Sequence, residues 1–115
     1  MPEFLHQNQK FYTPVEYALS KIGGTYKMPV LWRLKDRPWR YSELRKSIGH
    51  ISDRMLSKAL KELEGDGFIH KRLEAAVPVR AFYTLSDRGE QAIPMIEMLR
   101  RYGFALMEQD GIQHP

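Results

Sequence analysis

The sequence predicts one mostly helical α+β domain, and three observations lead to this fold class. The chain has 115 residues, which suits one hydrophobic core and leaves no room for a second of useful size. Hydrophobic residues make up 43% and charged residues 28%, the composition of an ordinary globular protein. Apolar positions recur at helical spacing over most of the chain and change to a strand-like pattern only in residues 68–85.

The first two segments of the chain differ in pattern. Residues 1–12 are polar with scattered aromatic side chains and no clear period, so we interpret them as an N-terminal arm with little structure of its own. Thr13 suits a helix N-cap, Pro14 suits the first helical position, and Glu16 can reach back to the cap. We therefore expect a helix that begins at Thr13 and ends at the paired glycines Gly23-Gly24.

Two shorter helices are expected next. The first occupies about residues 27–34, with Pro29 in its first turn, where a missing N–H costs little. Residues 39–41 form either a short strand or an extended lead-in. The second helix starts at the N-cap candidate Ser42 and ends at Gly49.

The longest clean pattern lies in the helix predicted over 52–66, which begins with a serine N-cap and is followed by a glycine. Residues 68–73 and 81–85 indicate two strands of an antiparallel hairpin, and a last helix follows over 86–110. Three helices followed by a two-stranded hairpin form a winged helix-turn-helix, in which the hairpin is the wing. This unit spans 13–85, within a single domain that takes in the whole chain.

Basic residues are concentrated in the middle of the chain. Residues 26–80 hold thirteen basic and seven acidic side chains, a net charge of +6, whereas the two ends together carry −2. A basic region between mildly acidic ends is typical of a surface that faces a polyanion. Charge alone, however, favours the simpler interpretation of a solvated helix face.

The helix over 52–66 has two different faces. Its apolar stripe consists of Leu56, Ala59, Leu60 and Leu63. Its cationic face carries Arg54, Ser57, Lys58 and Lys61 at the same intervals. A helix fits the major groove of B-DNA, about 12 Å across, with its N-terminal residues nearest to the base edges. The candidates for base contacts are Ser52, Asp53, Arg54, Ser57 and Lys58. Arg54 could donate to guanine, and Asp53 could accept from cytosine or orient Arg54.

The alternative for this face is a set of solubilising charges paired with Glu62 and Glu64. The short helix and turn before it favour DNA binding, because they complete a helix-turn-helix. Candidates for phosphate contacts are Arg40, Ser42, Arg45, Lys46 and Lys61. The wing adds Lys71, Arg72 and Arg80, which we expect against phosphates or in the minor groove. The wing tip, residues 75–79, is unusually apolar for a loop.

The last helix predicts a dimer. It carries apolar residues spaced alternately three and four apart, namely Ala92, Met95, Leu99, Tyr102 and Leu106. One small domain cannot cover so much apolar surface, so we expect one side to pack inward and the other against a second copy. The predicted dimer interface consists of Val15, Leu19, Met95, Ile96, Leu99, Tyr102 and Leu106. A symmetric dimer places two DNA-reading helices roughly 34–36 Å apart and requires a palindromic operator.

Several of these motifs, in this order, resemble the HxlR family of bacterial and archaeal transcription regulators over roughly residues 13–100. The matching motifs are Pro14-Val15-Glu16-Tyr17, Ile22-Gly23-Gly24, Tyr41-Ser42-Glu43-Leu44, Ile51-Ser52 with Met55-Leu56, Leu60-Lys61-Glu62-Leu63-Glu64 with Asp66-Gly67, Val77-Pro78 with Arg80, and Tyr83-Thr84-Leu85-Ser86 with Gly89. The resemblance implies a homodimer that binds operator DNA, with 52–66 as the recognition helix and 68–85 as the wing. Members often carry a cysteine directly before the first-helix proline, where this chain has Thr13. With no cysteine anywhere in the chain, thiol sensing is excluded.

Other function classes find less support. The four histidines are far apart, and no glycine-rich phosphate loop or nucleophile elbow occurs, so we expect no enzyme, metal or cofactor. No apolar run approaches the roughly 18–20 residues that cross a bilayer, and no secretory signal is present, so we expect a cytoplasmic protein. A winged helix for protein–protein assembly is the remaining alternative. A small-molecule effector stays open: the six methionines could line an effector cavity or simply fill the core.

Overall fold

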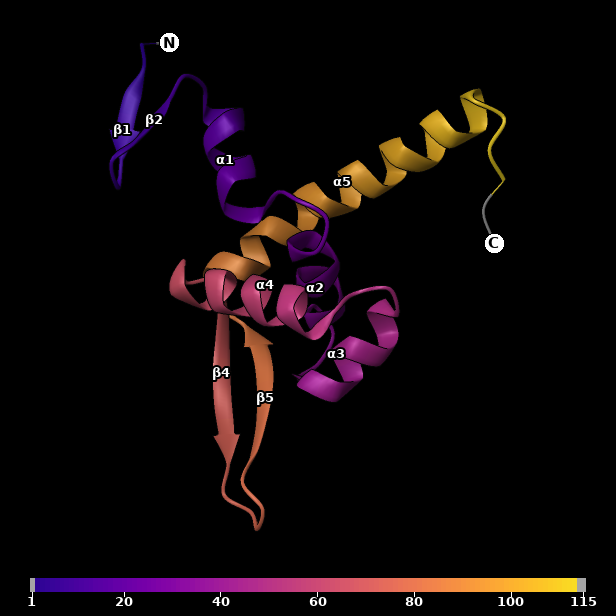
Figure 1. Cartoon of the computed structure of the whole chain (residues 1–115). Helices are drawn as coiled ribbons and strands as arrows, with labels where there is room; N and C mark the ends of the chain where they lie inside the picture. Colours follow the sequence, from indigo (N-terminus) through magenta and orange to yellow (C-terminus); the bar gives the residue numbers. More distant parts are fainter. Residues whose placement is uncertain (1, 114–115) are drawn as a thin grey trace.

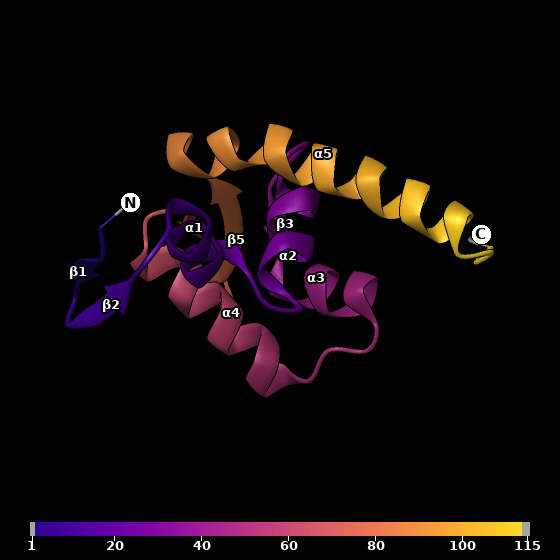
Figure 2. The same ribbon diagram turned by 90° about the horizontal axis from the view of Figure 1, so that it is seen from above.

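The computed structural model describes residues 2–113. In chain order the elements are β1 (Phe4–His6), β2 (Gln9–Phe11), α1 (Pro14–Ile22), α2 (Lys27–Leu34), β3 (Trp39–Arg40), α3 (Tyr41–Ile48), α4 (Asp53–Gly65), β4 (Ile69–Glu74), β5 (Arg80–Leu85) and α5 (Asp87–Gln109). Helix α2 lies between α4 and α5, and the β4–β5 hairpin projects from the body at the end away from α1 (Figures 1 and 2). This is the predicted mostly helical winged helix-turn-helix.

Helix α1 begins as its sequence predicts. The Thr13 side chain accepts a hydrogen bond from the Glu16 N–H at 3.0 Å, and Pro14 occupies the first turn. The Glu16 carboxylate accepts from the N–H of Tyr12 at 3.1 Å, one residue before the cap rather than at it. Gly23 then ends the helix, since a side chain there would collide with the Leu19 carbonyl oxygen.

The N-terminal arm is not unstructured, and this prediction was wrong. Strands β1 and β2 form an antiparallel hairpin in which Phe4 pairs with Phe11. Their rings stack at 5.5 Å between centroids, and the Tyr17 ring of α1 lies 5.0 Å from Phe11, which is only 2% exposed. Strands of three residues are too short to show a hydrophobic period. The aromatic side chains pack against one another only after the hairpin has brought them together.

The core of the body is assembled by α2, α3, α4 and the base of the sheet. Val30 and Leu31 of α2, Leu44 of α3, and Leu56 and Leu63 of α4 are completely buried in it. Helix α2 supplies contacts on both sides because it is enclosed by α4 and α5 (Figure 2). The core therefore holds α4 against the domain by one face only.

The wing belongs to a three-stranded sheet of order β3-β5-β4. The predicted hairpin is present, with Ile69 opposite Leu85 at its base and Glu74 opposite Arg80 near its tip. Of residues 39–41, for which two interpretations were open, Trp39 and Arg40 form the short strand β3, in which Trp39 pairs with Tyr83, and Tyr41 begins α3. Strand β3 connects directly to α3, so the base of the hairpin is tied to the start of the helix-turn-helix.

Helix α5 is anchored at its start. The Ser86 hydroxyl accepts from the Gly89 N–H at 3.1 Å and donates to the Gly67 carbonyl at 2.6 Å. A Cβ at Gly89 would lie 2.2 Å from the Phe68 carbonyl oxygen, so only glycine allows this approach. The beginning of α5 is thereby fixed against the turn that follows α4.

Only the first half of α5 packs on the domain. Ile96, predicted at the dimer interface, is 7% exposed and lies in the chain's own core, so this assignment is corrected. Met95 is partly buried against the same core, as is Met28, in keeping with methionines that fill the core. The second half of α5 extends beyond the body, with Leu99 and Tyr102 exposed (Figures 1 and 2).

Candidate nucleic-acid interface

The helix-turn-helix consists of α3, residues 49–52 and α4. Gly49 ends α3 with φ of +65°, a conformation that side chains disfavour. Ser52 then caps α4 by accepting from the Met55 N–H at 3.1 Å. After α4, Gly67 adopts φ of +81° and turns the chain into β4. The predicted boundaries and caps of α4 are confirmed.

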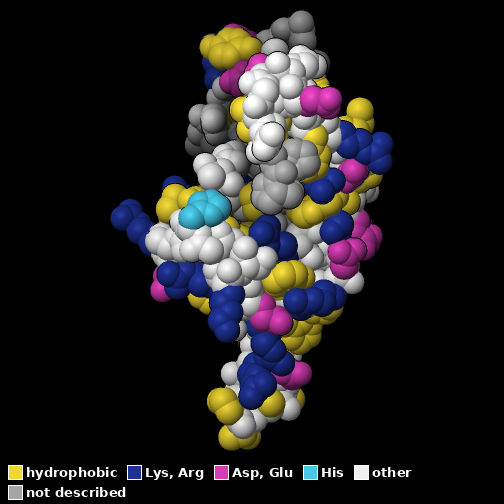
Figure 3. Space-filling view, turned by 90° about the vertical axis from the view of Figure 1, so that its right-hand side faces the viewer, with side chains coloured by type: hydrophobic (Ala, Val, Ile, Leu, Met, Phe, Trp, Pro, Cys, Tyr) yellow, Lys and Arg dark blue, Asp and Glu magenta, His cyan; other side chains and the backbone are white. Residues whose placement is uncertain are grey.

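Helix α4 presents a cationic face to solvent. Its four predicted core residues, Leu56, Ala59, Leu60 and Leu63, are all buried. Arg54, Lys58 and Lys61 are all exposed on the opposite side, and Ser57 beside them is half-buried. Figure 3 shows Lys and Arg side chains spread over the lower body and down the hairpin. The helix therefore offers its cations outward while its apolar stripe holds it in place.

These cations are largely unneutralised. Arg54 and Lys61 have no hydrogen bond or ion pair with any residue in 2–113, and Lys58 lies 4.0 Å from Glu62 with its side chain 76% exposed. Glu62 instead accepts from Lys27 Nζ at 2.7 Å, a contact that lowers the pKa of Glu62 against the opposing effect of burial. Glu64 makes no ion pair within the same residues. The alternative of solubilising charges paired with both glutamates is therefore not supported.

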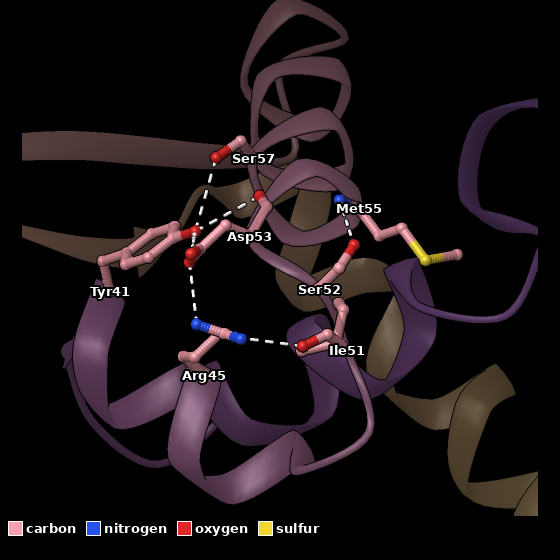
Figure 4. Close-up of polar contacts among 7 residues, drawn as sticks. All are labelled: Tyr41, Arg45, Ile51, Ser52, Asp53, Met55 and Ser57. Carbon is pink, nitrogen blue, oxygen red and sulfur yellow. Dashed lines mark hydrogen bonds and ion pairs between the residues drawn. The ribbon is translucent and has the colours of Figure 1, made fainter.

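The N-terminus of α4 is held by a polar cluster of Tyr41, Arg45 and Asp53 (Figure 4). The Tyr41 hydroxyl donates to Asp53 Oδ1 at 2.8 Å and lies 3.4 Å from Ser57 Oγ. Arg45 donates through Nη1 to Asp53 Oδ1 and through Nε to the Ile51 carbonyl, both at 2.9 Å. Helix α3 is thus joined to the turn and to the first residue of α4.

This cluster corrects one sequence assignment and qualifies another. Asp53 does not orient Arg54, because its carboxylate is bonded to Tyr41 and Arg45 instead. Arg45 is partly engaged, because its Nε and Nη1 donate to the Ile51 carbonyl and to Asp53, while its side chain stays 43% exposed. Tyr41, whose hydroxyl joins the two helices, was not among the predicted site residues, because no spacing rule relates an aromatic residue to an acid twelve positions later.

The candidate phosphate-binding residues around α3 differ in whether their charge is already paired. Arg40 donates through Nη2 to Glu74 Oε2 at 2.9 Å, so its charge is partly neutralised. Its N–H donates to Glu43, and this bond is the main cause of a lowered Glu43 pKa, with Arg37 adding to it. Ser42 does not cap α3, which begins one residue earlier at Tyr41. Lys46 is exposed and has no ion-pair partner in the described part of the chain.

The wing carries three further exposed cations. Lys71, Arg72 and Arg80 make no ion pair with any other residue of 2–113. They lie on adjacent antiparallel strands, where Glu74 opposite Arg80 is already bonded to Arg40. Their positions follow directly from the hairpin register.

A groove of about 620 Å³ lies beside the cationic face, between α4 and the loop that joins α1 to α2. Gly23, Gly24 and Tyr26 line one wall, and Arg54 and Met55 belong to the other. The paired glycines were expected only to end a helix, and no local sequence pattern indicated that they would face α4.

Among residues 2–113, no cluster of His, Asp or Glu has an arrangement suited to a metal ion. None of the helices in this range is long and apolar enough to cross a membrane.

The sequence matches the profile of the HxlR-like helix-turn-helix over residues 21–111. It is 42% identical over 93 residues to YdzF, an HTH-type transcriptional regulator of Bacillus subtilis strain 168, covering 80% of this chain and 85% of that protein. It is 38% identical over 96 residues to an HTH-type transcriptional regulator of Methanothermobacter thermautotrophicus, covering 84% and 73% respectively.

Solved structures agree with this grouping. The HTH-type regulator YtcD superposes with a TM-score of 0.79 at 33% identity, covering 84% of this chain and 99% of that one. The oxidised form of the redox regulator HypR superposes with a TM-score of 0.78 at 32% identity, covering 81% and 96%. The chain therefore belongs to the HxlR-like family of helix-turn-helix transcriptional regulators.

Proposed function

We propose that this regulator binds a palindromic operator as a homodimer, with α4 in the major groove and the β4–β5 hairpin as its wing. The observation that carries the proposal is the face of α4: Arg54 and Lys61 point into solvent without partners in the described chain, while the opposite stripe is buried. A solvent-facing cationic helix with a fixed N-terminus is suited to contact base edges in the major groove.

The contacts divide by chemistry. Arg54, in the first turn of α4, donates to guanine through its forked guanidinium, and Ser52, Ser57 and Lys58 lie near enough to the same end to assist. Lys46, Lys61 and the wing cations bind phosphates. Asp53 and Arg45 act differently from the initial expectation, since together with Tyr41 they position α4 rather than contact DNA.

The dimer is proposed from the apolar surface at the other end of the molecule. Val15 and Leu19 of α1 are 68% and 50% exposed, and Leu99, Tyr102 and Leu106 of α5 are 45%, 61% and 38% exposed. Both helices lie at the end opposite the hairpin tip (Figure 1). A second copy on this surface leaves both α4 helices free for DNA.

The test uses DNA duplexes that the wild-type protein selects from a random library. Binding of selected and random duplexes is measured by fluorescence anisotropy at two salt concentrations. Arg54→Ala is expected to remove most of the preference for the selected duplex, about 1–3 kcal/mol, whereas Lys61→Ala weakens both duplexes alike and lowers the salt slope by about one.

Leu5→Ser is the control, because Leu5 is 72% exposed on β1 and belongs to neither the cationic face of α4 nor the wing. The proposal fails if the wild-type protein selects no sequence, or if both cation variants bind like wild type. Weak binding that ignores sequence would favour the assembly module instead.

A further inference from the structure

The tip of the β4–β5 hairpin is exposed and apolar. Val77 is fully exposed, and Leu73 and Val79 are 71% and 67% exposed. Figure 3 shows the end of the hairpin as hydrophobic atoms at the lowest point of the molecule. Contiguous apolar residues at the end of a projecting loop are typical of a contact surface, because nothing in folding requires them there.

The tip is not covered by the rest of the described chain or by the proposed dimer. The exposed apolar residues of α1 and α5 lie at the opposite end of the molecule, so a second copy bound there leaves the hairpin free (Figure 1). The tip therefore stays open to a partner other than the second copy.

The charges behind the tip indicate the chemistry of this partner. Lys71, Arg72 and Arg80 lie on the hairpin strands without ion-pair partners among residues 2–113. Figure 3 shows dark-blue side chains directly above the apolar end. An apolar tip with a positive stem is complementary to DNA, in which charged phosphates line the rim of each groove and sugars and bases form its walls and floor.

The width of the hairpin limits how its tip can enter a DNA groove. The two strands lie about 4.8 Å apart, and their side chains make the hairpin wider than an undisturbed minor groove of about 6 Å. If the tip lies at the minor groove beside the major groove that holds α4, that groove must widen to admit more than the outermost side chains.

We propose that Val77 and Val79 form an apolar wedge that enters the minor groove beside each half-site and opens it. This inference rests on the proposed function. Pyrimidine–purine steps unstack easily and A-tracts resist, so the wedge makes affinity depend on flanking DNA that receives no hydrogen bonds. The base contacts of α4 provide one source of sequence specificity, and the wing adds a second, which depends on how easily the flanking DNA deforms.

The test compares wild type with the double variant Val77→Ser/Val79→Ser. Two duplexes share the selected operator core but carry either a TA step or an A-tract where the wing lies. Wild type is expected to bind the TA duplex about tenfold more tightly than the A-tract duplex and to bend it, as measured by energy transfer between dyes on its ends. The double variant should bind both duplexes equally and bend neither.

Two controls separate a wedge from a charge effect. Arg80→Ala should lower the salt slope but keep the TA preference, whereas the double variant keeps the slope and loses the preference. Leu5→Ser, an equally exposed apolar substitution on β1, should change neither. Circular dichroism confirms that each variant folds.

The outcomes are distinct. Equal DNA bending by wild type and the double variant overturns the wedge alone. The wedge is also overturned if the double variant bends DNA like wild type but differs from it in self-association. Failure of the wild-type protein to select any DNA overturns the proposed function and the wedge with it.

Discussion

Helices α4 and α5 carry similar apolar patterns but differ in what covers them. All four stripe residues of α4 are buried by the chain's own core. In α5, Ile96 is buried in that core, whereas Leu99 and Tyr102, one and two turns later, are 45% and 61% exposed. A hydrophobic period therefore predicts that a face will be covered, but it does not say whether the same chain or another one covers it.

The largest effect is expected where coverage is complete. Leu56→Ala should lower the free energy of unfolding by about 2–5 kcal/mol, because Leu56 is fully buried between α4 and the core. Leu106→Ala should cost less than about 1 kcal/mol in the monomer, because no cavity forms around an exposed side chain. Urea denaturation at low protein concentration measures both. Equal losses would contradict the contrast between the helices.

The second effect tests what covers the outer half of α5. Tyr102→Ala should weaken self-association about tenfold or more without unfolding the chain, since an aromatic residue at the centre of an interface contributes about 2 kcal/mol. Sedimentation equilibrium measures the association. Arg101→Ala, a change at an exposed residue whose side chain pairs with Glu97, is the matched control. An unaltered association constant for Tyr102→Ala would remove this residue from the interface.

The third effect concerns how α4 is fixed at its N-terminus. Tyr41→Phe removes the hydroxyl that donates to Asp53, which should cost about 0.5–1.5 kcal/mol of folding stability. It should also lower the ratio of selected to random DNA affinity several-fold, because α4 loses one of its two anchors on α3. Tyr12→Phe, on an exposed ring, should alter neither quantity. A normal affinity ratio for Tyr41→Phe would show that Arg45 alone suffices.

The smallest expected effect is a pH dependence of folding stability, which arises from the Lys27–Glu62 pair beside α4. Lys27 lowers the pKa of Glu62, so this pair stabilises the fold above the ordinary glutamate pKa of about 4.3 and ceases to do so as the pH falls through the lowered value. The contribution should be below about 1 kcal/mol, because the Glu62 side chain is 41% exposed. Glu62→Gln should reduce stability at pH 6, and this loss should shrink as the pH falls through the lowered pKa of Glu62, as measured by urea denaturation. Glu108→Gln, at an exposed residue, should show no such difference.

The caps and stripes of the helices could be predicted because they are local. Thr13, Ser52 and Ser86 each accept from the N–H three residues later, as their positions before apolar runs indicate. The hairpin of residues 68–85 was recognisable for the same reason, since its alternation and turn lie within one segment. These features need no knowledge of where the rest of the chain lies.

The candidate site was predicted only in part. The exposure of Arg54, Lys58 and Lys61 follows from the stripe on the other side of α4. Whether a given cation is free does not follow, because its partner can come from another element: Arg45 is bonded to Asp53, and Arg40 to Glu74 on the wing. Charge counts treat all of these residues alike, whereas the fold divides them into free and paired ones.

The sequence by itself determined the helix-turn-helix, the wing and the cationic face of α4, because caps, periods and turns act over a few neighbouring residues. The tertiary structure alone decided that Phe4 and Phe11 form a hairpin against Tyr17, that Ile96 faces inward, and that Tyr41 and Arg45 hold Asp53. Each of these contacts joins separate elements, so its energy exists only once the whole chain has brought them together.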